Sequence, residues 1–139
     1  MTIKKQFGGG RFEEVASYAR AKRVGPFFWV AGTTAIEPTG KIHAPDDAHA
    51  QSHYIFGRIE DALKDIGAEM SHVTAARAYY TAPEHVGGFA RAHGEVFKGI
   101  DPVLTAVQAG LSQPGLVIEI EVEGVVHDGN GAIPGQGGV

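Results

Sequence analysis

PVLTAVQAGLSQPGLVIEIEVEGVV, residues 102–126, reads as two strands joined by a turn at Pro114-Gly115. In the second strand, apolar residues alternate with three glutamates, Glu119, Glu121 and Glu123. Successive side chains of a strand point to opposite faces, so this strand should have one apolar face and one acidic face. The first strand contains no Lys or Arg, so any cations that balance the glutamates must come from another element.

The preceding sequence predicts a hairpin and then a helix. An apolar strand at residues 27–31 follows a turn at Gly25-Pro26, and a shorter strand precedes that turn. Further along, Asp46 or Asp47 is the expected N-cap of a helix that stops at Gly67. The helix has apolar residues at helical spacing, at positions 55, 59, 62 and 66.

A strand at residues 72–82 and a second helix at residues 82–100 complete the pattern. Pro83 suits the first turn of this helix. The Gly87-Gly88 pair is unfavourable in a helix and therefore indicates close packing at that point. The expected buried stripe consists of Val86, Phe89, His93, Val96 and Phe97.

The order strand, strand, helix, strand, helix, strand, strand predicts a single α+β domain over residues 1–139. The two helices can cover only one face of the sheet, so the other face must meet water or another subunit. Ile118, Ile120 and Val122 should lie under the helices, with the glutamates on the uncovered face. Both ends are rich in glycine, so the folded part is expected between about Phe12 and Val126, with flexible ends.

Composition and charge exclude several classes of function. The net charge is −4 and the 12 Lys and Arg residues are scattered, so we expect no nucleic-acid partner. The absence of cysteine excludes disulfides and thiolate chemistry. No apolar run approaches the roughly 18 residues of a membrane span, and the start MTIKKQFGGG is unlike a signal peptide. We therefore expect a cytoplasmic protein with no membrane partner.

Metal and cofactor motifs give little signal. His49 and His53 have the i, i+4 spacing of zinc sites, but the HExxH glutamate is missing and the sequence indicates no third ligand. We therefore expect surface histidines there and no metal. His93 falls on the buried stripe, where a satisfied core residue is expected. Neither a dinucleotide fingerprint nor a P-loop follows the glycines at 8–10, so no cofactor is expected.

Several runs together resemble the RidA/YjgF family. They are YARAKRVGPFFWVAGTTA, GAEMSHVTAARAYYT, RAHGEVF, and P..T.V followed by IEIE, and they span roughly residues 12–126. The resemblance implies a chorismate-mutase-like fold with a mixed sheet covered on one face by two helices. It also implies a homotrimer whose sheets face one another in a central barrel, with three ligand clefts between adjacent subunits. RidA-type members hydrolyse reactive enamines and imines to keto acids and ammonia.

The resemblance also implies site residues. Tyr18 matches the family tyrosine near the first strand, and Glu119 matches the first Glu of the final EIE, the expected catalytic residue. The family arginine, two residues after the proline of the penultimate strand, is replaced by Leu104. Because a guanidinium pairs with the substrate carboxylate and a leucine cannot, the chain is similar to the arginine-lacking branches of the family.

Further candidate binding residues are Arg77, Thr105 and Phe89. Arg77 should lie on the barrel-facing side, where it either forms a structural ion pair with a carboxylate at the trimer interface or partly replaces the missing substrate clamp. Thr105 either touches a ligand or contacts the neighbouring strand. Phe89 is either part of the cleft wall or part of the core, and Tyr18 either hydrogen-bonds a ligand or packs. Glu119, with its two neighbouring glutamates, could also simply form the wet face of the sheet.

The sequence thus predicts a trimeric protein that binds a small carbonyl or imine compound between subunits and hydrolyses C=N bonds with Glu119. Two alternatives stay open. One is a binding module without catalysis that senses or carries a metabolite. The other is RNA cleavage, as in some relatives, which the acidic balance and the absence of a basic groove disfavour.

Overall fold

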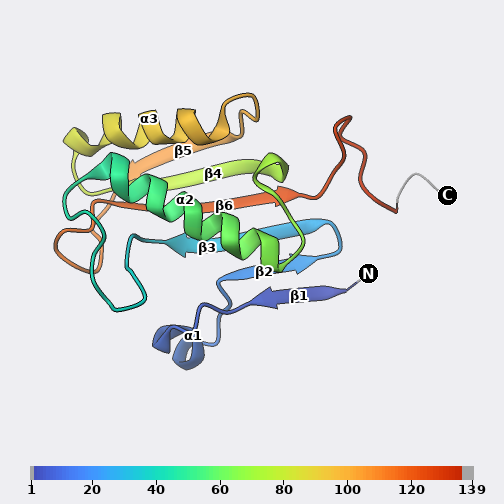
Figure 1. Cartoon of the computed structure of the whole chain (residues 1–139), viewed down its shortest axis with the longest axis horizontal. Coiled ribbons are helices and arrows are strands. Elements are labelled where there is room, and N and C mark those ends of the chain that lie inside the picture. Colours follow the sequence, from blue (N-terminus) through green and yellow to red (C-terminus); the bar gives the residue numbers. More distant parts are fainter. Residues whose placement is uncertain (1, 136–139) are drawn as a thin grey trace.

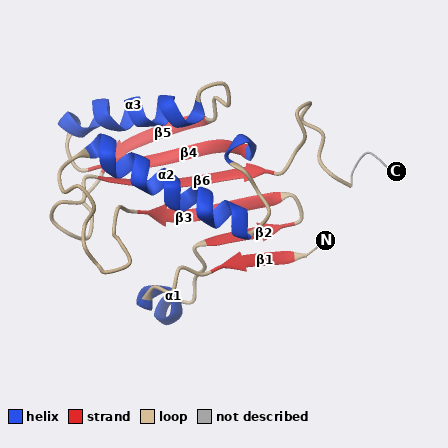
Figure 2. Ribbon diagram, viewed as in Figure 1, coloured by secondary structure: helices blue, strands red, loops and turns tan. Residues whose placement is uncertain are grey.

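One mixed sheet of six strands forms the body of the protein, and two long helices lie on one of its faces (Figures 1 and 2). The structure, a computed structural model, describes residues 2–135. The helices are α1 (Arg11–Ala16), α2 (Ala48–Asp65) and α3 (Val86–Phe97). The strands are β1 (Ile3–Gln6), β2 (Ala21–Val24), β3 (Phe27–Thr33), β4 (Val73–Tyr80), β5 (Val103–Gln108) and β6 (Ile118–Val125). The expected sheet with one helix-covered face is confirmed.

Local signals placed most elements correctly. Asp47 is the N-cap of α2, and its side chain accepts a hydrogen bond from the Ala50 amide. Gly67 follows the end of α2 with a positive φ of 75°, which glycine adopts without steric cost. β2 and β3 form the predicted antiparallel hairpin around Gly25.

The final two strands do not form a hairpin, which corrects the sequence prediction. β6 lies between β3 and β4 and is antiparallel to both, whereas β5 pairs in parallel with β4 at the edge of the sheet. The turn predicted at Pro114-Gly115 belongs to a longer connection that passes from β5 to the centre of the sheet. α3 supplies the crossover that a parallel pair such as β4 and β5 requires.

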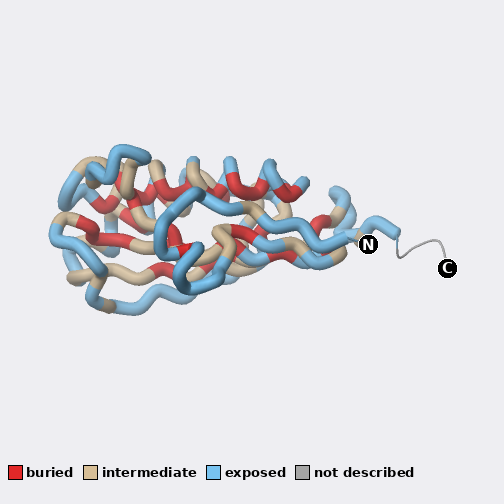
Figure 3. The backbone as a smooth tube through the Cα atoms, turned by 90° about the horizontal axis from the view of Figure 1, so that it is seen from below, coloured by how far each residue is buried: buried red, intermediate tan, exposed pale blue. Residues whose placement is uncertain are grey.

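The core lies between the helices and the sheet (Figure 3). On β6 the residues Ile118, Ile120 and Val122 are almost completely buried, as predicted. On the helical side, α2 contributes Ile55, Phe56, Ile59 and Leu63, and α3 contributes Phe89, Ala92 and Phe97. These residues of α2, α3 and β6 are at most 3% exposed within one chain.

The stripe of α3 differs in detail from the prediction. Val86 is exposed, because it stands at the very start of the helix, whereas Ala92 takes a buried position. His93 packs among Phe56, Phe89 and Phe97, but no described residue hydrogen-bonds its buried Nε2, so it is not the satisfied core histidine expected. Burial lowers the pKa of His93.

The ordered part begins earlier than expected. β1 pairs with β2 over four residues and adds an edge strand to the sheet, so the predicted start near Phe12 is too late. At the other end, residues 136–139 of the stretch predicted to be flexible lie outside the described residues. Within residues 2–135, no helix combines the length and the apolar character needed to cross a bilayer.

Candidate functional site

The uncovered face of the sheet carries charged, aromatic and apolar side chains together. We call it the open face. β6 contributes Glu119, Glu121 and Glu123, which are half-buried, and β4 contributes Arg77 and Tyr79, which pair in register with Glu121 and Glu119. Exposed apolar residues surround these groups, from Ile3, Val24, Phe27 and Trp29 on one side to Val103 and Val107 on the other.

Arg77 is the cation that meets two of the glutamates. Its Nη2 lies 2.6 Å from Glu123 Oε1 and 3.3 Å from Glu121 Oε2. The hydrogen bond to Glu123 and the charge of Glu121 raise the pKa of the guanidinium. Tyr79 donates a hydrogen bond to the other oxygen of Glu121, which raises the pKa of the phenol. Arg77 thus forms its ion pairs within one chain, with two carboxylates of the adjacent strand β6. A carboxylate partner at a trimer interface and a contact with a ligand both stay predictions.

Glu119 is in a different position. No described residue donates a hydrogen bond to its carboxylate, although Glu121 and Glu123 on the same strand both accept one. Burial raises the pKa of Glu119 above its ordinary value. The charge of Arg20 lowers this pKa in part, and the charge of Glu121 raises it further. A carboxyl group in this environment holds its proton to a higher pH than a surface glutamate does.

A pocket of about 260 Å³ opens beside Glu119 on the open face. Its walls come from four parts of the chain: β3, the adjacent strands β4 and β6, and the loop that follows β5. They are Gly32, Tyr79, Glu119, Glu121 and the run Ala109, Gly110, Leu111 and Ser112. Carboxyl and hydroxyl groups therefore face a concave space, which is where a small polar ligand would bind.

A bulge in β3 shapes this pocket. The register with β6 shifts between Val30 and Thr33, which leaves an extra residue on β3. Gly32 lies in the bulge, and a Cβ there would overlap the Glu119 carboxylate. Arg20 Nη2 holds the bulge, since it donates to Ala31 O at 3.0 Å, Gly32 O at 2.6 Å and Thr33 Oγ1 at 3.0 Å. The glycine thus leaves room for the carboxyl group, and the arginine fixes the backbone that limits it.

The structure does not gather all the predicted site residues in one chain. Thr105 shares the open face with Arg77, its register partner. Leu104 pairs with the buried Ala76, so its side chain points to the opposite face at the sheet edge, where it is 43% exposed. Tyr18 precedes β2, which is four strand spacings, about 19 Å, from β5.

Phe89 is placed in the core. It is 2% exposed and packs in the cluster between the helices and the sheet, away from the pocket walls. The hypothesis that it forms a cleft wall is therefore wrong for this chain, because α3 turns the ring toward the sheet's covered face. The core alternative holds.

Sequence reasoning missed Gly32 and Arg20. A glycine inside a predicted strand is a known signal of a bulge or of a close approach, so Gly32 could have been found. Arg20 carried no such signal, because its acceptors are backbone carbonyls 11 and 12 residues away and a hydroxyl 13 residues away. Those acceptors become available only when the bulge forms.

Comparisons with known proteins agree on the class defined by this fold. The solved structure of Rv2704 from Mycobacterium tuberculosis, a member of the YjgF/YER057c/UK114 family, has a TM-score of 0.80 and 34% identity, covering 90% of this chain and all of that one. The uncharacterised protein SCO2049 of Streptomyces coelicolor is 29% identical over 87% of this chain and 90% of its own length. The RutC family protein PYRAB12510 of Pyrococcus abyssi is 27% identical over 77% and 84%, respectively.

A family model described as endoribonuclease L-PSP matches residues 9–126, which include every strand from β2 to β6 and all three helices. This chain belongs to that family, the RidA/YjgF family. The family and the fold predicted from the sequence are both confirmed.

Proposed function

We propose that this protein binds a small carbonyl or imine compound in clefts between the subunits of a homotrimer and hydrolyses C=N bonds there with Glu119. The observation that carries the proposal is the state of Glu119: a half-buried carboxyl group with a raised pKa, no described hydrogen-bond donor, and a pocket in front of it. Ion pairs account for the two other glutamates of β6, so Glu119 is the one left for chemistry.

Imine hydrolysis suits one such carboxyl group. Water adds its oxygen to the C=N carbon while the nitrogen receives a proton, and the resulting amino alcohol then releases ammonia and leaves a carbonyl group. A carboxyl whose pKa lies nearer neutrality can give a proton to the nitrogen and take one from the water. Glu119 serves as this acid and base, and Tyr79 and Glu121 border the same space.

The distribution of residues over the sheet supports an assembled site. Tyr18 lies near one edge of the sheet and Thr105 lies on the strand at the other edge, so they can meet around one ligand only when neighbouring subunits bring opposite edges together. Leu104 lies on the same edge strand with its side chain on the other face, so it can take part only where the ligand reaches the rim of the sheet. The exposed apolar side chains of the open face would be covered in such an assembly. Light scattering should then give three times the chain mass of 14.7 kDa.

Leu104 narrows the substrate class. The resemblance places an arginine here in deaminating relatives, where it would hold a carboxylate, and leucine offers only apolar contact. The substrate is therefore an apolar or weakly polar carbonyl or imine compound rather than the imine of an amino acid. This replacement also supports the second candidate, a module that binds a metabolite without catalysis.

The endoribonuclease description of the family model gives weaker guidance. Two glutamates line the pocket, and the chain carries a net charge of −4. Both repel a phosphate backbone, whose binding needs Lys and Arg. We therefore place C=N hydrolysis before RNA cleavage.

The test is the rate of loss of freshly generated imines, produced in situ by an amine oxidase from apolar amines and, for comparison, by an amino-acid oxidase from several amino acids. Wild type is compared with Glu119→Gln, Leu104→Arg and the matched control Glu123→Gln, a glutamate on the same strand face that does not line the pocket. We expect wild type and Glu123→Gln to accelerate the loss of apolar imines, and Glu119→Gln to lose about 100-fold or more of that rate.

The outcomes separate the candidates. If wild type is inert toward the imines of amino acids and Leu104→Arg gains activity on them, the scaffold is competent and the natural ligand lacks a carboxylate. If Glu119→Gln retains the wild-type rate, the role of Glu119 is wrong. If wild type and Leu104→Arg are both inert but small carbonyl compounds bind, the module without catalysis is the better description.

A further inference from the structure

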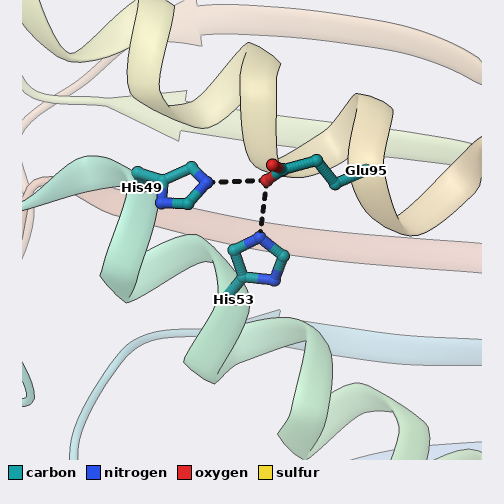
Figure 4. Close-up of side chains that lie close together, drawn as sticks. All are labelled: His49, His53 and Glu95. Atoms are coloured by element: carbon teal, nitrogen blue, oxygen red, sulfur yellow. Dashed lines mark hydrogen bonds and ion pairs between the residues drawn. The ribbon is translucent and has the colours of Figure 1, made fainter.

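A cluster of two histidines and one glutamate lies on the outer surface of the helical layer (Figure 4). His49 and His53 are one turn apart on α2, and Glu95 reaches toward them from α3. Glu95 Oε1 is 2.6 Å from His49 Nε2 and 2.8 Å from His53 Nε2. The sequence indicated no third ligand beside the two histidines; the structure supplies one, from 42 residues beyond His53.

We propose that His49, His53 and Glu95 bind a zinc ion. Two histidines and a glutamate are a donor set of zinc sites in which water or another ligand completes the coordination. The three donor atoms lie within 4.8 Å of one another, and all three side chains are partly exposed, so an ion can enter from solvent. The site is independent of the proposed function, because the pocket beside Glu119 lies on the opposite face of the sheet.

The geometry needs only a small adjustment. Zinc that holds its ligands at about 2.1 Å in a tetrahedral arrangement separates them by about 3.4 Å. The Glu95 oxygen therefore has to withdraw by less than about 1 Å from the two imidazoles to admit the ion. Its side chain is 52% exposed and extends from the last turns of α3, so it has room to do so.

The two imidazoles are held ready for a shared ligand. Their ring centroids are 4.7 Å apart with an interplanar angle of 73°, and both Nε2 atoms point to the same carboxylate oxygen. A zinc ion between them would be bound by the lone pair of each Nε2, which requires imidazoles that are neutral and carry their proton on Nδ1. Imidazole and carboxylate donors without cysteine favour zinc, and they also accept copper and nickel.

Close packing of the two helices fixes the distance across the site. A Cβ at Gly88 of α3 would lie 3.0 Å from the His49 amide nitrogen and 3.2 Å from Ala48 Cβ, which shows how near α3 passes to the start of α2. The close packing predicted from the Gly87-Gly88 pair is therefore found at Gly88, where a larger side chain would crowd the start of α2. A zinc ion would join α2 to α3 across this contact and hold the helical layer together.

The test is a zinc titration of protein without a histidine tag, in competition with a chromogenic chelator. The variants are His53→Ala and Glu95→Gln. The matched control is His43→Ala, which removes a histidine that also pairs with a glutamate, Glu37 at 3.0 Å. Among residues 2–135, no second histidine joins this pair to form a three-ligand group. We expect one zinc per chain in wild type and in His43→Ala, and a loss of affinity beyond about 10-fold in each of the other two variants.

Two further readouts follow the site directly. Zinc should raise the melting temperature of wild type and of His43→Ala, and not of His53→Ala or Glu95→Gln, because only a ligand of the folded state stabilises it. Cobalt in place of zinc should give visible absorption bands that both variants lose. All three substitutions are at partly exposed positions, and circular dichroism verifies that the variants fold.

Three results would overturn the proposal. One is zinc binding that His53→Ala and Glu95→Gln leave unchanged, which would mean adventitious binding only. Another is an equal loss of affinity in His43→Ala. The third is half an ion per chain, which would mean that two molecules share zinc at their surfaces. Failure of any kind here leaves the imine assay unaffected, since that assay concerns the open face.

Discussion

The two faces of one strand, β6, meet very different surroundings. On the covered face Ile118, Ile120 and Val122 are 0–1% exposed and need nothing beyond this chain. On the open face, two glutamates share Arg77 and the third has no described donor. The covered face therefore contributes most of the stability. The open face carries polar groups whose hydrogen bonds are only partly satisfied within the chain. We expect substitutions on the two faces to differ in kind as well as in size.

The largest effect should come from the covered face. Ile120→Ala should lower the free energy of unfolding by about 3–5 kcal/mol, because it removes a fully buried side chain between the helices and the sheet and leaves a cavity. Urea denaturation at fixed protein concentration measures it. Ile120→Val, which removes one methylene, is the control and should cost only about 1 kcal/mol. A loss below about 1 kcal/mol for the alanine variant would show that this face is less tightly packed than described.

A smaller effect should follow from the bulge beside the pocket. Arg20→Ala removes the donor shared by two carbonyls and a hydroxyl, which should lower the free energy of unfolding by about 1–3 kcal/mol. It should also move the backbone at Gly32 and thereby the Glu119 carboxylate. The control is Arg20→Lys, which keeps the positive charge but lacks the planar guanidinium. If the alanine variant unfolds like wild type, the bulge does not depend on Arg20.

The ion pair between Arg77 and Glu123 on the open face should contribute less to the free energy of unfolding than the interactions of Arg20. A double-mutant cycle with Arg77→Ala and Glu123→Ala should give a coupling energy of about 0.2–1 kcal/mol, because both side chains are partly exposed and solvent screens them. The coupling should fall with added salt. A value well above 2 kcal/mol would mean that neighbouring subunits desolvate the pair, which would sharpen the contrast between the faces and favour the barrel arrangement.

The smallest effect, and one of opposite sign, is expected at Glu119. Its pKa is higher in the folded protein than in the unfolded chain, so the folded state binds its proton more strongly. Any stability linked to this group is present below the unfolded pKa and is lost as the pH rises through the folded pKa. Glu119→Gln should therefore be more stable than wild type at neutral pH, by less than about 1 kcal/mol for a half-exposed group.

Unfolding curves at pH 7 and near pH 4 test this prediction. The advantage of Glu119→Gln should shrink at the lower pH, where the wild-type carboxyl becomes protonated. Glu123→Gln is the matched control, and it should not gain stability, because it gives up a charge-assisted bond to Arg77. A Glu119→Gln variant that is less stable than wild type at pH 7 would mean that the carboxylate makes favourable contacts when charged.

Local chemistry explains what could be predicted from the sequence. Asp47 as a cap, Gly67 as a stop and the alternation on β6 all depend on neighbours within a few residues, and all three appear in the structure. The pairing of β5 does not depend on its neighbours. Its apolar pattern fits a hairpin with β6 as well as a parallel pair with β4, and the crossover through α3 decides between them.

The residues of the candidate site also fall into two groups, those that the local sequence pattern predicts and those that it does not. Glu119 was found through its strand and through the family resemblance. Arg77 was assigned to the correct face by alternation. Arg20, beside the pocket, was missed because its acceptors are brought close only by the bulge. Glu95, in the separate zinc site that we propose, was missed because only the packing of α3 against α2 brings it to the two histidines. Interactions of this kind join segments that are distant in sequence, and no local pattern marks them.

The position of β6 also bears on how the protein is made. Among residues 2–135 it is the last strand in sequence order, yet it lies in the middle of the sheet and separates β1, β2 and β3 from β4 and β5. A nascent chain that lacks it has two partial sheets with unpaired inner edges and a helical layer without its main apolar partner. The domain can therefore close only after residues 118–125 have been synthesised, and its folding should wait for this strand and then proceed as one cooperative step.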